Sequence, residues 1–245
     1  MSRLRRIGLL VPSTNTTVEA DFQRLAASVA SFHSQRMHAS ARGEMSASML
    51  EEMNENLSTE ASCLGSAEVD AIGYACTSGT FIKGPEWDRQ VTETIRAATD
   101  RPAIATMSAV EAALRHLGAR RISVVTPYPE WTNNRMKAYF EASGFEVLSI
   151  QSDTAAAAGG HRFINDQIPA EIANFAAGAC DPQADALVCS CTAWRALEVA
   201  DTLEDRTGKP VVTSNQALLR ALLQLVGIDQ PLAGGGSLLR DTRPV

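Results

Sequence analysis

Two stretches of the chain, VDAIGYACTSG at residues 69–79 and ADALVCSCTAW at residues 184–194, share one pattern. In each, a short apolar run typical of a buried strand leads to a cysteine that is followed by threonine. The two cysteines, Cys76 and Cys191, are 115 positions apart. In open parallel sheets, ligands bind beyond the carboxyl ends of the strands. The pattern therefore predicts two related strands that each present a cysteine at such an end.

The same spacing relates other parts of the sequence. Segment 5–12, RRIGLLVP, is similar to segment 120–127, RRISVVTP, again 115 positions later. Asp70 and Asp185, each near the start of a predicted strand, match at that offset too. Because several matches share one offset, we infer an internal duplication rather than chance similarity between two generic α/β units.

Apolar runs alternate with helical patterns through both halves. Near-continuous apolar strands separated by helices are typical of parallel sheets that are covered on both faces. We therefore predict an α/β fold with two pseudo-symmetric flavodoxin-like lobes, each a parallel sheet flanked by helices, and an active site in the cleft between them. Residues 1–108 are expected to form the N-terminal lobe, completed by a C-terminal helix within 216–245, and residues 109–215 the C-terminal lobe. The predicted strands lie within 5–12, 69–76, 101–108, 119–133, 145–151, 184–191 and 209–214. The predicted helices lie within 13–28, 48–64, 85–99, 108–118, 169–178 and 216–227.

Composition narrows the classes of function. The formal net charge of the 245 residues is −6, and no basic stripe is present, so nucleic acid is not an expected partner. No segment has transmembrane length, and the first apolar run is too short for a signal peptide, so we expect a cytoplasmic protein without a membrane partner. The chain lacks dinucleotide and P-loop motifs, and its histidines and cysteines show no zinc spacing, so neither a cofactor nor a metal is expected. An odd count of five cysteines favours free thiols over disulfides.

The paired cysteines suggest a chemistry. If the lobes face each other across a cleft, Cys76 and Cys191 approach from opposite sides, and each is followed by small polar residues. Free backbone N–H groups where a helix starts attract anions and lower the pKa of a thiol, so we expect both thiol pKa values to be lowered. Such a site suits a small anionic substrate, with the thiols acting as acid and base or as nucleophile and proton donor. Two inert buried cysteines are the alternative interpretation.

A family resemblance follows from these residues. Strand-end Cys-Thr pairs in a duplicated α/β chain resemble the aspartate/glutamate racemase superfamily, and IGLLVPSTNTTVEADF at residues 7–22 resembles the start of the maleate cis–trans isomerase family. The resemblance implies a cofactor-independent isomerase that converts maleate, or a related small dicarboxylate, to fumarate through a covalent cysteine adduct. It also implies a homodimer or a higher homo-oligomer.

The resemblance assigns roles to particular residues. Cys76 matches the nucleophile that adds to the alkene, and Cys191 matches the cysteine that assists as acid or base. Asn15 and Asn165 match asparagines that bind substrate carboxylates, and Tyr128 matches a tyrosine that contacts the substrate from the second half. The full set of expected substrate-binding residues is Asn15, Thr77, Ser78, Tyr128, Asn165 and Thr192.

Other functions stay open at this point. An aspartate/glutamate or hydantoin racemase would use the two cysteines as paired bases at one stereocentre. CTAWRALEVAD at residues 191–201 is more similar to the ectoine-utilisation and racemase-like members of the superfamily than to the maleate isomerases. A decarboxylase of the arylmalonate type uses only the second cysteine, so Cys76 counts against it. A two-lobed binding protein that closes on a small acid is the alternative without catalysis.

Overall fold

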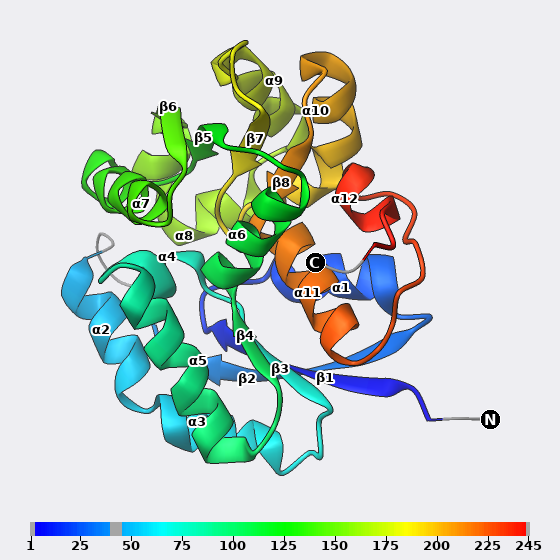
Figure 1. Cartoon of the computed structure of the whole chain (residues 1–245). Helices are drawn as coiled ribbons and strands as arrows, with labels where there is room; N and C mark the ends of the chain where they lie inside the picture. The colour runs from blue at the N-terminus through cyan, green and yellow to red at the C-terminus, as the bar shows by residue number, and fades with distance from the viewer. Residues whose placement is uncertain (1–2, 40–45, 244–245) are drawn as a thin grey trace.

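The computed structural model describes residues 3–39 and 46–243, which form two four-stranded sheets (Figure 1). The strand orders are β2-β1-β3-β4 and β6-β5-β7-β8, and every pairing is parallel. Helices flank both sheets, which confirms the predicted two-lobed α/β fold. The strands are β1 (Arg5–Pro12), β2 (Ala30–Met37), β3 (Ala71–Tyr74), β4 (Ala103–Ala105), β5 (Arg121–Thr126), β6 (Glu146–Ser152), β7 (Ala186–Cys189) and β8 (Val211–Thr213).

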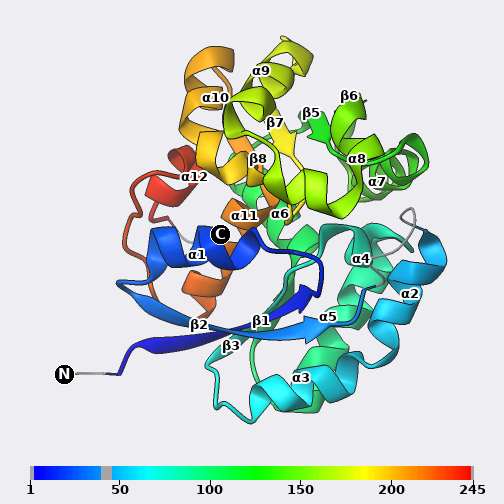
Figure 2. The ribbon, with the colours of Figure 1, turned by 180° about the vertical axis from the view of Figure 1, so that it is seen from behind.

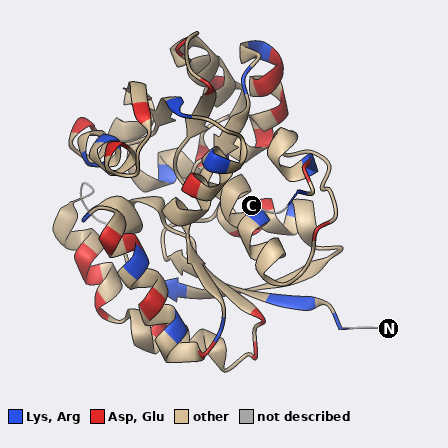
Figure 3. Ribbon diagram, in the orientation of Figure 1, with Lys and Arg blue, Asp and Glu red and all other residues tan. Residues whose placement is uncertain are grey.

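The helices alternate with the strands along the chain. They are α1 (Val18–Ala26), α2 (Ala47–Glu55), α3 (Leu57–Gly65), α4 (Thr77–Phe81), α5 (Pro85–Thr99), α6 (Thr106–His116), α7 (Glu130–Ala142), α8 (Thr154–Asp166), α9 (Pro169–Ala179), α10 (Ala200–Thr207), α11 (Ser214–Leu225) and α12 (Gly236–Arg240), with a short 3₁₀ helix, η1 (Arg195–Val199). Along the ribbon, positions of Lys and Arg and positions of Asp and Glu are scattered over the helices and strand ends (Figure 3). Within the described residues, no helix is long and apolar enough to cross a membrane.

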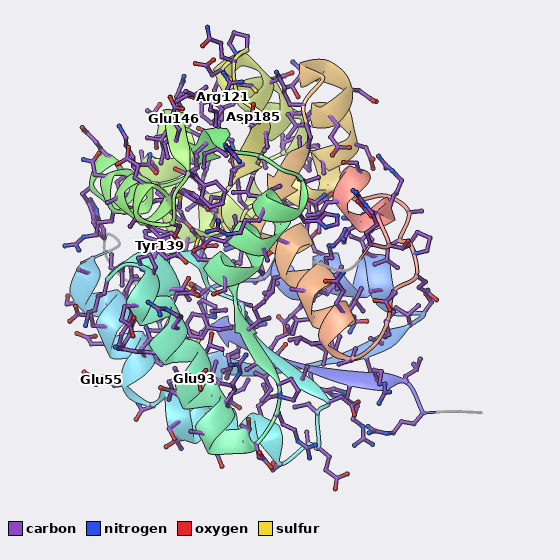
Figure 4. The ribbon with its side chains drawn as sticks, viewed as in Figure 1. Glu55, Glu93, Arg121, Tyr139, Glu146 and Asp185 are labelled. Carbon is purple, nitrogen blue, oxygen red and sulfur yellow. The ribbon has the colours of Figure 1, made fainter. Side chains whose placement is uncertain are left out.

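The sequence repeat has a counterpart in the hydrogen bonds. The backbone N–H of Arg6 donates to the Asp70 carboxylate at 2.8 Å, and the N–H of Arg121 donates to the Asp185 carboxylate at the same distance. Each aspartate thereby joins the starts of the two central strands of its sheet. Arg121 also contacts Asp185 through its guanidinium, at 2.9 Å, at the edge of the second lobe (Figure 4). The matched arginine and aspartate positions are therefore structural, and they set the same register in both sheets.

β2, α7, α8 and α10 are among the elements that were not expected from the sequence. β2, with the sequence ASFHSQRM, is an edge strand whose residues are mostly half-buried or exposed, so it lacks the apolar run of the other strands. α8 crosses a segment with two adjacent glycines, which is typical of a loop. The Asp153 side chain caps it by accepting from the N–H groups of Ala155 and Ala156, and Gly160 bends it with a φ of +68°. The single helix expected within 48–64 is instead two helices, α2 and α3.

α6 and α11 hold the two sheets together. They pack side by side, and each contacts both β4 and β8, the last strands of the two sheets. α11 also lies against β3 and α1 (Figure 2). A Cβ atom on Gly73 of β3 would lie 2.7 Å from Cδ1 of Leu222, so a larger residue there would have to displace this side chain of α11. The carboxyl ends of the central strands of both sheets therefore face one another.

Candidate active site

A cavity lies where the carboxyl ends of β1 and β3 meet those of β5 and β7. It encloses about 480 Å³ of empty space, including its open mouth. Seven of the eight predicted site residues line it, and only Asn165 does not. The polar lining consists of Thr14, Asn15, Cys76, Thr77, Ser78, Tyr128, His161, Cys191 and Thr192, and the apolar lining of Pro12, Ala39, Met49, Leu50, Met53, Ile164 and Ala193.

Cys76 occupies the N-cap position of α4, two residues after the end of β3. Its Sγ accepts from the N–H of Gly79 at 3.4 Å and lies 3.7 Å from the Ser78 hydroxyl. A Cβ on Gly79 would lie 2.4 Å from the Tyr74 hydroxyl, so a larger residue here would have to displace the buried Tyr74 side chain. Burial raises the pKa of the Cys76 thiol, and the hydrogen bonds from Gly79 and Ser78 oppose that rise.

Cys191 reaches the cavity from the second sheet, two residues after β7. A turn follows it rather than an α-helix. Burial raises the pKa of this thiol to about 11, while hydrogen bonds from the Tyr128 hydroxyl and the Ala193 N–H oppose the rise. The Tyr128 hydroxyl also interacts with Thr77, so it bridges the polar groups of the two lobes. The ring of Tyr128 packs edge-on against Phe81, at 6.1 Å between centroids.

The predicted lowering of the thiol pKa values is wrong for the free protein. Both cysteines are more than nine-tenths buried, at 5% and 7% exposure, and the loss of hydration disfavours the thiolate more than the nearby N–H groups favour it. Both thiols are consequently neutral at pH 7. Any reaction that needs a thiolate must create it when substrate is present.

This ionisation has a measurable consequence. We expect alkylation of Cys76 and Cys191 by iodoacetamide to accelerate continuously from about pH 7 to about pH 10, because the thiolate fraction keeps rising below a raised pKa. Peptide mass spectrometry at several pH values measures each rate, with the exposed Cys63 in the same sample as a reference. A rate that reaches its plateau below pH 8 for either cavity cysteine would contradict the raised pKa.

Asn15 connects three parts of the site. Its Oδ1 accepts from the N–H groups of Thr17 and Val18, at 2.9 and 3.2 Å, and thereby caps α1. Its Nδ2 donates to the Thr192 hydroxyl at 3.1 Å, and this hydroxyl donates to the carbonyl of Ala75 at 3.1 Å. One amide hydrogen of Asn15 is left to contact a ligand in the cavity.

Comparison with known proteins places this cavity in a family. A family model described as arylmalonate decarboxylase matches residues 7–239. The maleate isomerase of Pseudomonas putida is 30% identical to this chain and covers 98% of both chains. The chain belongs to the arylmalonate decarboxylase and maleate isomerase family. This membership confirms the resemblance carried by residues 7–22 and by the two Cys-Thr pairs.

Solved structures of this family share the whole fold. The maleate isomerase from Pseudomonas putida S16 superposes with a TM-score of 0.91 at 26% identity, covering 98% of this chain and 100% of that one. A Nocardia farcinica maleate cis–trans isomerase with a cysteine-to-serine substitution and a covalently bound succinylcysteine intermediate gives 0.88 at 28% identity, with 97% and 99% coverage. The arylmalonate decarboxylase of Bordetella bronchiseptica is 29% identical over 72% of this chain and 69% of its own length.

Asn165 lies behind the cavity of this family member. Its Nδ2 donates to the carbonyls of Thr14 and His161, at 3.0 and 2.7 Å. Its Oδ1 accepts from the Thr16 N–H at 3.0 Å and from the Thr17 hydroxyl at 3.1 Å. Both amide hydrogens are therefore used in this conformation, and Asn165 fixes α8 against the loop between β1 and α1. Its binding of substrate stays a prediction.

Sequence reasoning missed several lining residues. His161 lines the cavity one helical turn before Asn165, and the i, i+4 spacing would have indicated it if α8 had been expected. Met49, Leu50 and Met53 stand at helical spacing in the sequence, but nothing there shows that they face the cysteines. Over the stretches that the structure describes, no three His, Cys, Asp or Glu side chains are grouped to hold a metal ion.

Proposed function

We propose that the protein is an isomerase that converts maleate, or a closely related small cis-dicarboxylate, to fumarate through a covalent adduct on Cys76. One observation carries the proposal: thiols from matched positions of the two sheets line a single cavity and are close enough to influence each other's ionisation. The maleate isomerase relatives support the choice of reaction, since they match almost the entire chain.

The reaction balances with these two thiols. The Cys76 thiol gives its proton to solvent water, and its sulfur attacks one alkene carbon, so that the π electrons move to the other carbon and into its carboxylate. The Cys191 thiol protonates that carbon, which gives a succinyl thioether with a rotatable C2–C3 bond. After rotation, the Cys191 thiolate removes the proton, the C–S bond breaks, and fumarate and the Cys76 thiolate are released. In the Nocardia relative, a succinylcysteine exists in a protein that has lost a cysteine, which supports one thiol as the nucleophile and a different one as the proton carrier.

Neutral donors around the thiols suit the charge that develops on the carboxylate. Tyr128 and Asn15 line the cavity together with Thr77, Ser78 and Thr192. The Thr77 hydroxyl is held by Ser214 at 3.1 Å, at the start of α11. Donors that are already fixed in place stabilise a developing anion without reorganising, which is commonly the largest contribution to catalysis.

The proposal is tested by proton NMR of the purified protein with maleate. We expect the vinyl signal of maleate to be replaced by that of fumarate, with no added cofactor. Parallel samples contain single enantiomers of aspartate and glutamate in D2O, and phenylmalonate. Exchange of the Cα proton without conversion of maleate would indicate a racemase. Decarboxylation of phenylmalonate would indicate an arylmalonate decarboxylase. No change in any sample would favour a binding protein without catalysis. The oligomeric state and the cytoplasmic location stay predictions.

A further inference from the structure

His161 has a defined place at the mouth of the cavity. It directly follows Gly160, whose positive φ bends α8, and its carbonyl accepts from Asn165. The same Asn165 amide also donates to the carbonyl of Thr14, in the loop between β1 and α1. His161 lines both the reaction cavity and an outer groove with Thr14 and Arg162. Its ring can therefore meet a ligand inside and exchange a proton with solvent outside.

A dicarboxylate raises a charge problem in this cavity. Two carboxylates must leave water, and burying an unpaired carboxylate is costly. One wall, built from Met49, Leu50, Met53 and Ile164, is apolar. Among the described residues, no lysine or arginine lines the cavity, and His161 is the one lining side chain that can become a cation.

We propose that His161, in its protonated form, binds one carboxylate of the dicarboxylate substrate, the other being held by the neutral donors around the thiols. This inference rests on the proposed function, since it concerns the same cavity and the same class of substrate. His161 thereby selects dianions over substrates with a single carboxylate. The Asn165 amide acts as a positioning group for it, through the His161 carbonyl.

The charged side chains near His161 are paired with one another, so His161 can gain or lose a proton without an unpaired charge beside it. On α8, Arg162 pairs with Asp166 at 3.5 Å, and on the adjacent η1, Arg195 pairs with Glu198 at 2.6 Å. The loop of residues 13–17 has no titratable side chain, α2 presents apolar side chains, and across the cavity stand the two thiols and the phenol of Tyr128.

Binding and protonation of His161 are consequently linked. Burial lowers the pKa of His161 from its ordinary value. A carboxylate beside the ring favours the charged form and raises that pKa. Between the free and bound pKa values, binding takes up one proton from solvent, and affinity falls as pH rises through this window. Below both values the ring is already charged, so no proton is taken up.

The test is calorimetric titration of maleate into full-length Cys76→Ser, which binds without forming the adduct. Titrations in buffers of different ionisation enthalpy give the number of protons taken up at about pH 6 to 8. We expect uptake that approaches one proton. His161→Gln in the same background is expected to abolish the uptake and weaken binding about 10- to 100-fold, as for the loss of a hydrogen bond between charged groups. His161→Lys is expected to restore affinity without uptake, because its charge is fixed over this range.

The control and the outcomes separate the two proposals. Arg162→Gln, on the adjacent residue, removes a charge that faces Asp166 rather than the cavity, and it is expected to change neither affinity nor uptake. If maleate binds and His161→Gln leaves both quantities unchanged, the role of His161 is refuted and the proposed function stands. If no maleate binds to the Cys76→Ser protein or to the unmodified protein, both are refuted. Rescue by glutamine as well as lysine would also contradict a charge role.

Discussion

Replacing Cys76 with serine is expected to lower the rate of fumarate formation by about 10⁴-fold or more, the scale seen when a catalytic nucleophile is removed. Serine nearly keeps the shape of cysteine, but its hydroxyl ionises far less readily than a thiol. The N–H of Gly79, which contacts Sγ at 3.4 Å, does not offset that difference. Initial rates followed by NMR measure the effect, and circular dichroism checks that the fold is retained.

Two other cysteines provide the controls for this result. Cys63 is exposed, and Cys180 is half-buried with its thiol donating to the Asp181 carbonyl, so neither lines the cavity. Cys63→Ser and Cys180→Ser are expected to keep the unmodified rate. Turnover within tenfold of that rate in Cys76→Ser would show that the nucleophile lies elsewhere.

Replacing Cys191 with serine is expected to trap the adduct. Turnover should fall about 10²- to 10⁴-fold, the usual contribution of a positioned acid or base. Because removal of the proton from the succinyl carbon is slowed, the thioether on Cys76 should accumulate. Intact-mass spectrometry is expected to show one added maleic acid, and peptide mapping should place it on residue 76. The Tyr128 hydroxyl, which interacts with Cys191, remains to bind the substrate.

Cys189 offers a matched control for this variant. It lies two residues before Cys191 in the same segment, yet it is fully buried in the core and does not line the cavity. Cys189→Ala is expected to turn over maleate without a lasting adduct. If Cys76→Ser instead accumulates an adduct on Cys191, the two thiols have the opposite roles from those proposed.

The sequence was sufficient for the fold because its main signals are local and repeated. The Cys-Thr pairs mark strand ends, and parallel sheets bring such ends together, so the meeting of Cys76 with Cys191 was predictable. β2 was not predictable in this way. It is an edge strand with several polar and half-buried residues, so it lacks the continuous apolar run of the other strands. α8 was hidden by Gly159 and Gly160, although the Asp153 cap supports a helix there.

The chemistry of the site depends on features that no short segment records. The thiol pKa values are raised because residues of several elements bury the two cysteines. The nearby backbone N–H groups lower these pKa values, and only their effect could be predicted from the sequence. Asn165 resembled a substrate ligand, but its four hydrogen bonds go to residues 14, 16, 17 and 161, contacts that only tertiary packing creates. His161 gained its place at the mouth through the same packing.

The side-by-side placement of α6 and α11 between the two sheets bears on the origin of the chain. Since each of these helices contacts the last strand of both sheets, two identical half-length polypeptides could have interlocked around the same cleft as a symmetric pair. Their two sulfurs would then have had identical neighbours. Fusion into one polypeptide allowed those neighbours to diverge. The Gly79 N–H now donates to the Cys76 sulfur, and the Tyr128 hydroxyl donates to the Cys191 sulfur.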